Sequence, residues 1–405
     1  MSALKIVADE NIPCVEEALG DLGTIVRCPG RSIGPATVDD ADVLLVRSVT
    51  TVAPPLLDES PVRFVGSATI GTDHVDRAYL QERGVAFAHA PASNADSVAD
   101  YVVAALCVLA QRRGVSLEGR TVGIVGCGNI GGRLARRLPA LGMTVLRNDP
   151  PRAAAEAGPE APAFVSLDTV LDRADLLTLH VPYTTTGPHA THHLIGEAAL
   201  SRLDADAWLL NTARGPVVDG AALLGALRHD ALGAAVLDVW EDEPTPDPAL
   251  VRAVDLATPH IAGYAWDGKV RGTAMLYDAL CEHLGVEKTW SPEAVLRPEH
   301  PSALHCRAPD PRLPRTDWLD QLAQQAYDLR ADDARMRALP DRPPSERGAH
   351  FRRLRATYPR RREMSRFEVS AASVPAAHRS AVAEGLTLQP RAPGRYDRGA
   401  GRYDR

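Results

Sequence analysis

The sequence predicts an α/β protein in which two doubly wound parallel sheets are followed by a small C-terminal α+β domain. Short apolar, β-branched runs alternate with helix-like stretches from residue 5 to residue 257, the pattern of parallel sheets covered by helices. A glycine-rich turn between a predicted strand and a predicted helix then marks the start of a second α/β unit.

With 405 residues, 45% hydrophobic and 24% charged, the chain has the composition of an ordinary globular protein of two or three domains. Its formal net charge of −7 weighs against nucleic acid as a partner. No run approaches the roughly 18 apolar residues of a membrane span, and no signal peptide is recognised, so we expect no membrane partner. Six cysteines without metal-ligand spacing predict reduced thiols, no metal site and a cytoplasmic location.

The first α/β unit is predicted from runs in which apolar and β-branched residues are continuous, as in strands buried on both faces. Strands are expected at residues 5–8, 43–46, 63–65 and 85–88. A helix is expected at 14–22. A longer helix at 95–111, with apolar positions at three- and four-residue steps, leads into the second unit.

The second unit shows the same alternation over six further strand candidates, which predicts a doubly wound sheet. These strands are expected at residues 121–125, 144–146, 176–179, 208–211, 234–237 and 256–257. After about residue 285 the composition changes, with a proline-rich segment at 286–316 and an arginine-rich one at 340–366. An amphipathic helix at 317–330 predicts a small third domain, and the repeated Gly-Arg-Tyr-Asp-Arg at the end predicts a disordered tail.

The glycine-rich turn predicts a dinucleotide site. Its sequence is Gly126-Cys-Gly128-Asn129-Ile130-Gly131, after the strand at 121–125 and before a helix expected at 132–141. Gly126 permits the tight turn, Gly128 lets the backbone approach a pyrophosphate, and Gly131 lets the helix pack on the strand. The free N–H groups at the helix start would then face the anion.

Asp149 predicts which dinucleotide is bound. It lies eighteen residues beyond Gly131, at the end of the next strand. A carboxylate there accepts hydrogen bonds from ribose hydroxyls and repels a 2′-phosphate, so NAD is favoured over NADP. Arg152 weakens this preference slightly, because a nearby arginine accommodates that phosphate.

Three segments that follow successive strands of the second sheet supply groups for oxidising a 2-hydroxy acid. Such a reaction needs a cation for the carboxylate, a base for the hydroxyl proton and a group that orients the base. Arg214, beside a glycine, suits bidentate carboxylate binding. His260 is the candidate base, and Glu243 is its candidate partner. Asp238 is placed to meet the nicotinamide.

Together the glycine-rich turn, Asn211-Thr-Ala-Arg-Gly, Asp238-Val-Trp-Glu-Asp-Glu-Pro and Thr258-Pro-His-Ile-Ala-Gly resemble the D-isomer-specific 2-hydroxy-acid dehydrogenase family. The resemblance implies that Arg214 binds substrate, Glu243 tunes the histidine and His260 transfers the proton. It implies NAD as cofactor, with contacts from Gly126, Gly128, Asn129, Ile130, Gly131, Asp149, Val181, Thr212, Asp238 and Gly263.

Further segments narrow the resemblance to family members that oxidise 4-phospho-D-erythronate on the route to pyridoxal 5′-phosphate. They include Val46-Arg-Ser-Val-Thr50, Gly66-Ser-Ala-Thr-Ile-Gly-Thr-Asp-His-Val-Asp76 and Tyr327-Asp-Leu-Arg-Ala-Asp-Asp333. The resemblance implies a phosphorylated 2-hydroxy acid as substrate, contacted by Ser48, Thr69 and Tyr264, and a homodimer formed by the C-terminal domain. Most arginines of 352–366 are interpreted as a solvated basic face, whereas Arg361 is implied to reach the partner subunit's site and pair with the substrate phosphate.

The domain organisation is expected to be discontinuous. Residues 1–98 and 262–285 would bind substrate, 99–261 would form the Rossmann NAD domain, 286–390 would dimerise, and 391–405 would be disordered. Two alternatives remain: another D-2-hydroxy-acid dehydrogenase, such as one acting on 3-phosphoglycerate, or an NAD-sensing, co-repressor-like binding protein. An intact Arg–Glu–His set discriminates against the second.

Overall fold

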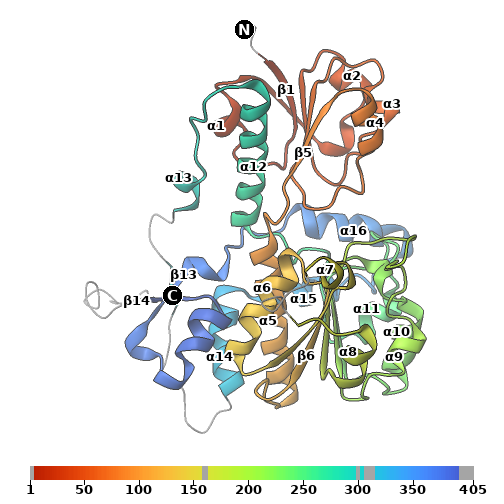
Figure 1. Cartoon of the computed structure of the whole chain (residues 1–405), viewed down its shortest axis with the longest axis vertical. Helices are drawn as coiled ribbons and strands as arrows, with labels where there is room; N and C mark the ends of the chain where they lie inside the picture. The colour runs from red at the N-terminus through yellow and green to blue at the C-terminus, as the bar shows by residue number, and fades with distance from the viewer. Residues whose placement is uncertain (1–3, 157–162, 298–301, 305–314, 392–405) are drawn as a thin grey trace. The chain divides into compact units, whose positions relative to one another are not determined.

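The computed structural model describes residues 4–156, 163–297, 302–304 and 315–391 and divides the chain into two compact units (Figure 1). Unit 1 contains Met1–Val98 and Gly263–Pro298, and unit 2 contains Ala99–Ala262 and Glu299–Arg405. The predicted tail falls almost wholly outside the described residues. In the part of the chain described, no helix is long and apolar enough to cross a membrane, and no three His, Cys, Asp or Glu side chains are grouped to hold a metal ion.

Unit 1 is built on a parallel five-stranded sheet in the order β2-β1-β3-β4-β5. The strands are β1 Leu4–Asp9, β2 Gly23–Cys28, β3 Val43–Val46, β4 Phe64–Ser67 and β5 Ala86–His89. The helices are α1 Val15–Leu19, α2 Pro35–Val38, α3 Pro54–Leu57, α4 Arg77–Glu82, α12 Trp266–Leu284 and α13 Glu293–Leu296. Alternate strand residues face opposite sides of the sheet. Ile6 therefore packs with α1 and α12, and Val7 with α2–α4 (Figure 1).

Unit 2 contains a parallel six-stranded sheet in the order β11-β10-β9-β8-β6-β7. The strands are β6 Thr121–Val125, β7 Thr144–Asn148, β8 Leu176–Leu179, β9 Trp208–Asn211, β10 Ala234–Leu237 and β11 Leu256–Ala257. The helices are α5 Ala95–Arg113, α6 Asn129–Arg137, α7 Pro150–Ala155, α8 Leu167–Arg173, α9 Glu197–Leu200, α10 Gly220–Arg228 and α11 Pro248–Ala253. The strand order reverses between β6 and β8, which is where ligands of such sheets bind.

The C-terminal part of the chain packs into unit 2. Its elements are β12 Ser302–Leu304, α14 Arg315–Ala326, α15 Leu329–Met336, α16 Pro344–Ala356, β13 Phe367–Ser370 and β14 Gln389–Arg391, with β12-β13-β14 forming a parallel sheet. Met336 and Phe351 are fully buried in the same apolar core as Leu209 of β9. Asp333 accepts a hydrogen bond from the Ala257 N–H at 2.9 Å. The structure thus joins this segment to the sheet that carries the glycine-rich turn.

The predicted fold class, two parallel α/β sheets followed by a small C-terminal region, is confirmed, but three local predictions differ from the structure. Strand β2 was not predicted, because this edge strand is half-exposed and its sequence mixes polar with apolar residues. The helix after the glycine turn begins at Asn129 rather than 132 and ends at Arg137, where Pro139 continues the chain as a 3₁₀ turn.

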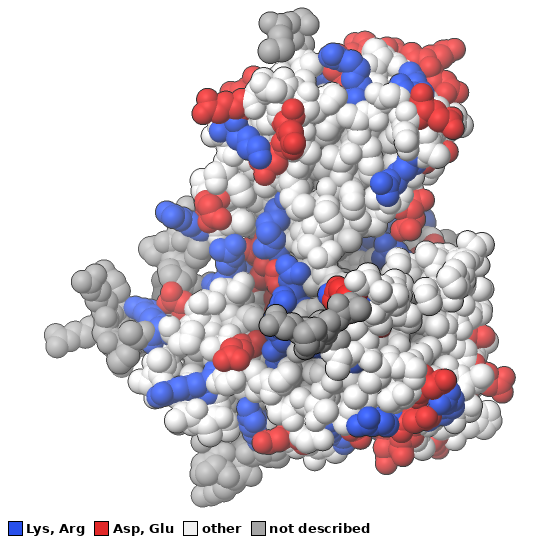
Figure 2. Space-filling view, viewed as in Figure 1, with Lys and Arg blue, Asp and Glu red and all other residues white. Residues whose placement is uncertain are grey.

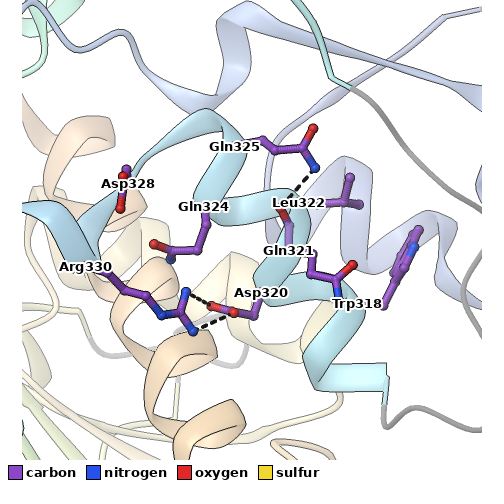
Figure 3. Close-up of a pocket in the computed structure, with 8 residues that line it drawn as sticks. All are labelled: Trp318, Asp320, Gln321, Leu322, Gln324, Gln325, Asp328 and Arg330. Atoms are coloured by element: carbon purple, nitrogen blue, oxygen red, sulfur yellow. Dashed lines mark hydrogen bonds and ion pairs between the residues drawn. The ribbon is translucent and has the colours of Figure 1, made fainter.

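The predicted helix at 317–330 is in fact two helices. It ends at Ala326, and the Asp328 side chain begins α15 by accepting a hydrogen bond from the Ala331 N–H at 3.0 Å. Asp320 and Arg330 bridge the break with two hydrogen bonds of 3.2 and 2.7 Å (Figure 3). The pocket drawn there is lined by none of the residues predicted for the functional site.

Charge is unevenly spread over the surface. Acidic side chains gather over α2–α4 of unit 1 in the view of Figure 2, in keeping with the net charge of −7. In the interior of unit 2, Arg137 of α6 and Asp100 of α5 form an ion pair of 2.9 Å, with both side chains less than 10% exposed. Arg137 also donates to the Gly385 carbonyl, and Asp100 accepts from the Met364 N–H.

Replacing Arg137 by methionine is expected to destabilise the protein by about 3–5 kcal/mol, because the Asp100 carboxylate would remain buried without its cation. Burial already raises the pKa of Asp100 to about 6 against the opposing effect of Arg137. A raised carboxyl pKa means that the folded state binds the proton more tightly, so the contribution of this group to stability grows as pH falls through about 6.

Urea unfolding at pH 8 and pH 5 measures this effect. The loss caused by Arg137→Met should be larger at pH 8, where Asp100 is charged. Arg136→Met, on an exposed position of the same helix, is the control. A loss that is equal at both pH values would contradict the assignment to the Asp100 charge.

Candidate active site

The glycine-rich turn after β6 has the geometry of a dinucleotide site. Gly126 has a φ of 87°, and a Cβ there would lie 2.7 Å from the His180 backbone. At Gly131 a Cβ would lie 2.0 Å from the Gly126 carbonyl oxygen, so the missing side chain lets α6 pack close to the turn. At Gly128, by contrast, a Cβ would meet open space. The residues therefore fit a pyrophosphate placed over Gly128 at the start of α6.

The Asp149 carboxylate ties this turn to the end of β7. It accepts hydrogen bonds from the Cys127 N–H at 2.8 Å and from the Arg152 N–H at 3.2 Å. Each oxygen retains a lone pair for a ribose hydroxyl. The Arg152 guanidinium donates hydrogen bonds to Glu156 and to the Cys127 carbonyl. The cation that was expected to weaken the preference for NAD is therefore bound to groups of the protein itself.

Two residues near the turn keep neutral side chains. Cys127 is 2% exposed, and burial raises the pKa of its thiol to about 11. Burial lowers the pKa of His180 to about 3, and its ring contacts the hydroxyls of Thr178 and Thr212. Thr212, a predicted cofactor contact, is thus held by His180 at the end of β9. Val181, which was also predicted to contact the cofactor, is half-buried beside the turn at Gly126.

His260 and Glu243 form the predicted pair. The His260 Nδ1 lies 2.9 Å from one Glu243 oxygen, and the other oxygen accepts from the Trp240 N–H at 2.9 Å. Burial alone would raise the pKa of Glu243, but the His260 ring and the Trp240 hydrogen bond outweigh it and hold that pKa below its ordinary value. With Nδ1 directed at the carboxylate, Nε2 is the ring nitrogen available for proton transfer.

Asp238 anchors the loop that carries His260. Its 1%-exposed carboxylate accepts hydrogen bonds from the Thr258 hydroxyl and the Ile261 N–H at 2.7 Å and from the Ala262 N–H at 2.9 Å. The structure therefore gives Asp238 a loop-holding role that the sequence did not suggest, while its contact with the cofactor remains a prediction.

Arg214 follows β9 in a loop held by its neighbours. The Asn211 side chain bonds to both the Ala213 N–H and the Arg214 carbonyl. A Cβ at Gly215 would lie 1.9 Å from the Trp240 carbonyl oxygen, so glycine is required where this loop meets the one that follows β10. The structure thus brings the segment of Arg214 against the segment of Glu243.

Three predicted substrate residues and Gly263 belong to unit 1. Ser48 is exposed. The Thr69 hydroxyl contacts the Ser67 hydroxyl and the Gly71 carbonyl. The Tyr264 ring lies 4.5 Å from the Lys269 ammonium and 5.9 Å from the Arg47 guanidinium. Sequence reasoning missed these two cations, although Arg47 directly precedes Ser48. Gly263 packs so close to Asn94 that a Cβ would clash.

Arg361 is buried rather than part of a solvated face. It is 8% exposed and lies in the interior of unit 2, where it donates to the Ala262 carbonyl at 2.5 Å and covers the Tyr327 ring at 3.9 Å. Only its Nη2 atom has hydrogen-bond partners, whereas Nε and Nη1 are buried without one among the described residues. Its contact with a substrate phosphate stays a prediction.

Comparison with known proteins identifies the family. Residues 87–262 match the D-isomer specific 2-hydroxyacid dehydrogenase, NAD binding domain, and residues 311–382 match a domain of unknown function, DUF3410. The erythronate-4-phosphate dehydrogenase of Salinibacter ruber is 63% identical over 96% of this chain and 100% of its own. That of Pseudomonas fluorescens is 48% identical over 90% and 94%.

Solved structures agree with this match. The D-lactate dehydrogenase of Aquifex aeolicus complexed with NAD and lactic acid is 26% identical with a TM-score of 0.57, covering 69% of this chain and 95% of its own. The 2-hydroxyacid dehydrogenase of Ketogulonicigenium vulgare is 25% identical with a TM-score of 0.60, covering 71% and 98%. The predictions of an NAD-dependent dehydrogenase and of NAD as cofactor are confirmed. The chain therefore belongs to the D-isomer-specific 2-hydroxyacid dehydrogenase family and, within it, groups with the erythronate-4-phosphate dehydrogenases.

Proposed function

We propose that this chain oxidises 4-phospho-D-erythronate to (R)-3-hydroxy-2-oxo-4-phosphooxybutanoate, a step on the route to pyridoxal 5′-phosphate. The observation that carries the proposal is the 2.9 Å contact between His260 and Glu243, in a chain 63% identical to a curated erythronate-4-phosphate dehydrogenase. We further propose that it acts in the cytoplasm, as a homodimer formed through residues 286–390.

His260 acts as the base. Its Nε2 accepts the proton of the substrate 2-hydroxyl, while NAD, when bound, would supply the acceptor for the hydride that leaves the same carbon. Glu243 stabilises the imidazolium that forms, and its own orientation is fixed by the Trp240 N–H. Arg214 holds the substrate carboxylate and polarises the developing carbonyl. In the dinucleotide site, Asp149 would accept hydrogen bonds from the ribose hydroxyls and the start of α6 would hold the pyrophosphate of NAD.

Arg47 and Lys269 support a phosphorylated substrate. Both cations lie beside Tyr264, a residue predicted to contact substrate, in the same unit as Ser48 and Thr69. A phosphate carries up to two negative charges at neutral pH and binds most strongly to clustered Lys and Arg side chains. We assign them to recognition of the terminal phosphate.

The substrate assignment is tested by following NADH fluorescence with 4-phospho-D-erythronate, 3-phosphoglycerate and D-lactate offered side by side. The expected result is fastest reduction of NAD with the first. A stronger response to 3-phosphoglycerate would favour another dehydrogenase of the family. An equal response to all three acids, or none, would remove the assignment.

Replacing His260 by alanine is expected to lower kcat by about 10²–10⁴-fold, because the proton acceptor is lost. NAD affinity, measured by fluorescence titration, should stay within about twofold, since the residue lies outside the glycine turn. Glu243→Gln should also lower kcat, because a neutral amide stabilises the imidazolium less than a carboxylate does. Full turnover by His260→Ala would show that another group accepts the proton and would remove the role assigned to His260.

Replacing Lys269 by methionine should raise KM for 4-phospho-D-erythronate by about tenfold while leaving kcat within a few-fold. The reason is that a contact with the phosphate stabilises the bound substrate and the transition state equally. Arg47→Met should act in the same direction. Lys288→Met, at a half-exposed ion pair with Asp278 of the same unit, is the control. An unchanged KM in both site variants would place the phosphate elsewhere.

A further inference from the structure

The loop from Thr258 to Ala262 has a strained backbone conformation that neighbouring groups must hold in place. His260 has a φ of 58°, in the left-handed region that non-glycine residues rarely adopt, at a cost on the order of 1 kcal/mol. Such a conformation persists only where neighbouring groups enforce it. On one side, the Asp238 carboxylate binds the N–H groups of Ile261 and Ala262.

Arg361 contacts the carbonyl groups of the same two residues. Its terminal nitrogen donates to the Ala262 carbonyl at 2.5 Å and lies 3.5 Å from the Ile261 carbonyl. The N–H groups of these two residues are therefore bound by the buried Asp238 carboxylate, and their carbonyl groups are bound by the buried Arg361 guanidinium. Arg361 lies in the C-terminal segment, which sequence considerations assigned to dimerisation and substrate contact.

Arg361 stacks on Tyr327, and Tyr327 in turn contacts Tyr101. The Tyr327 ring lies 3.9 Å below its guanidinium, and the Tyr101 ring lies 6.3 Å from that of Tyr327. The Tyr101 hydroxyl contacts the Thr258 hydroxyl at 2.7 Å, and Thr258 donates to Asp238. Arg361 is thus connected to Ala262 directly and to Thr258 through the two tyrosine rings. Displacing its guanidinium therefore disturbs both ends of the segment that carries His260.

We propose that Arg361 is a positioning residue for proton transfer: it fixes the Ile261 and Ala262 carbonyls, and through them the orientation of His260 toward Glu243. The inference rests on the proposed role of His260 as base. It gives the C-terminal segment a direct part in the oxidation step within its own chain, and it differs from a contact between Arg361 and the substrate phosphate.

The first test compares Arg361→Met with Arg360→Met, which changes the exposed neighbouring arginine. With 4-phospho-D-erythronate, Arg361→Met should lower kcat by about 10–100-fold, since a misplacement of about 1 Å costs up to about 10²-fold, with KM within about twofold. Arg361→Lys, which keeps one donor, should recover part of the loss, and Arg360→Met should match wild type. A KM raised tenfold with kcat nearly unchanged would establish the phosphate contact and overturn the proposal.

A double-mutant comparison separates positioning from general loss of structure. If Arg361 acts through the His260–Glu243 pair, Arg361→Met should cost less than about threefold in kcat when Glu243 is already glutamine. An equal cost in both backgrounds would overturn the proposal. Thermal unfolding shows whether the variants fold, and should Arg361→Met fail to fold, Tyr327→Leu removes the ring beneath the guanidinium and should give the same kcat-selective loss.

The His260 ring resonances of the full-length chain provide a measurement that needs no substrate. They are assigned by their absence in His260→Ala and followed by NMR from pH 5 to 9. Arg361→Met should change their chemical shifts, and Arg360→Met should not. Unchanged resonances would overturn the positioning role. A wild-type chain inactive on every acid would remove the proposed function, while this measurement would still decide whether Arg361 orients His260.

Discussion

The Asp238 carboxylate sits at the end of β10 and collects hydrogen bonds from Thr258, Ile261 and Ala262. An ionised group with 1% exposure is costly unless its oxygens are satisfied, and here three donors satisfy them. These hydrogen bonds fix the conformation of the loop after β11. The backbone of this loop in turn places the His260 ring beside Glu243. Three other features depend on this buried carboxylate. They are the left-handed conformation of His260, the hydrogen bond from Arg361 to Ala262 and the contact between Tyr101 and Thr258.

Much of the fold could be predicted because the central strands are short, continuous apolar runs. The strands β3, β6, β8, β9, β10 and β11 coincide with the predicted ranges. The edge strand β2 escaped prediction because half-exposed residues carry little periodicity. The break between α14 and α15 escaped because it depends on Asp328 satisfying a backbone N–H, and the helical pattern of apolar residues continues through it.

The site followed from sequence to the extent that its groups lie at successive strand ends. Parallel strands carry Arg214, Glu243 and His260 to one edge of the sheet by topology alone. The surroundings of Arg361 could not be predicted, because its partners Ala262 and Tyr327 are distant in the chain and an arginine-rich run normally indicates a solvated face. Of the cations beside Tyr264, Arg47 was missed because it is distant from Tyr264 in the chain, and Lys269 because no distinctive motif surrounds it.

Cys127 occupies the second position of the glycine-rich turn, where a reactive thiol would expose the dinucleotide site to oxidants and alkylating agents. Its sulfur is enclosed between the turn and β7, and with a pKa of about 11 it carries almost no thiolate at physiological pH. Thiolates, not thiols, react with peroxides and electrophiles. The thiol of this turn is therefore a poor nucleophile toward oxidants and alkylating agents, although it lies beside the dinucleotide site.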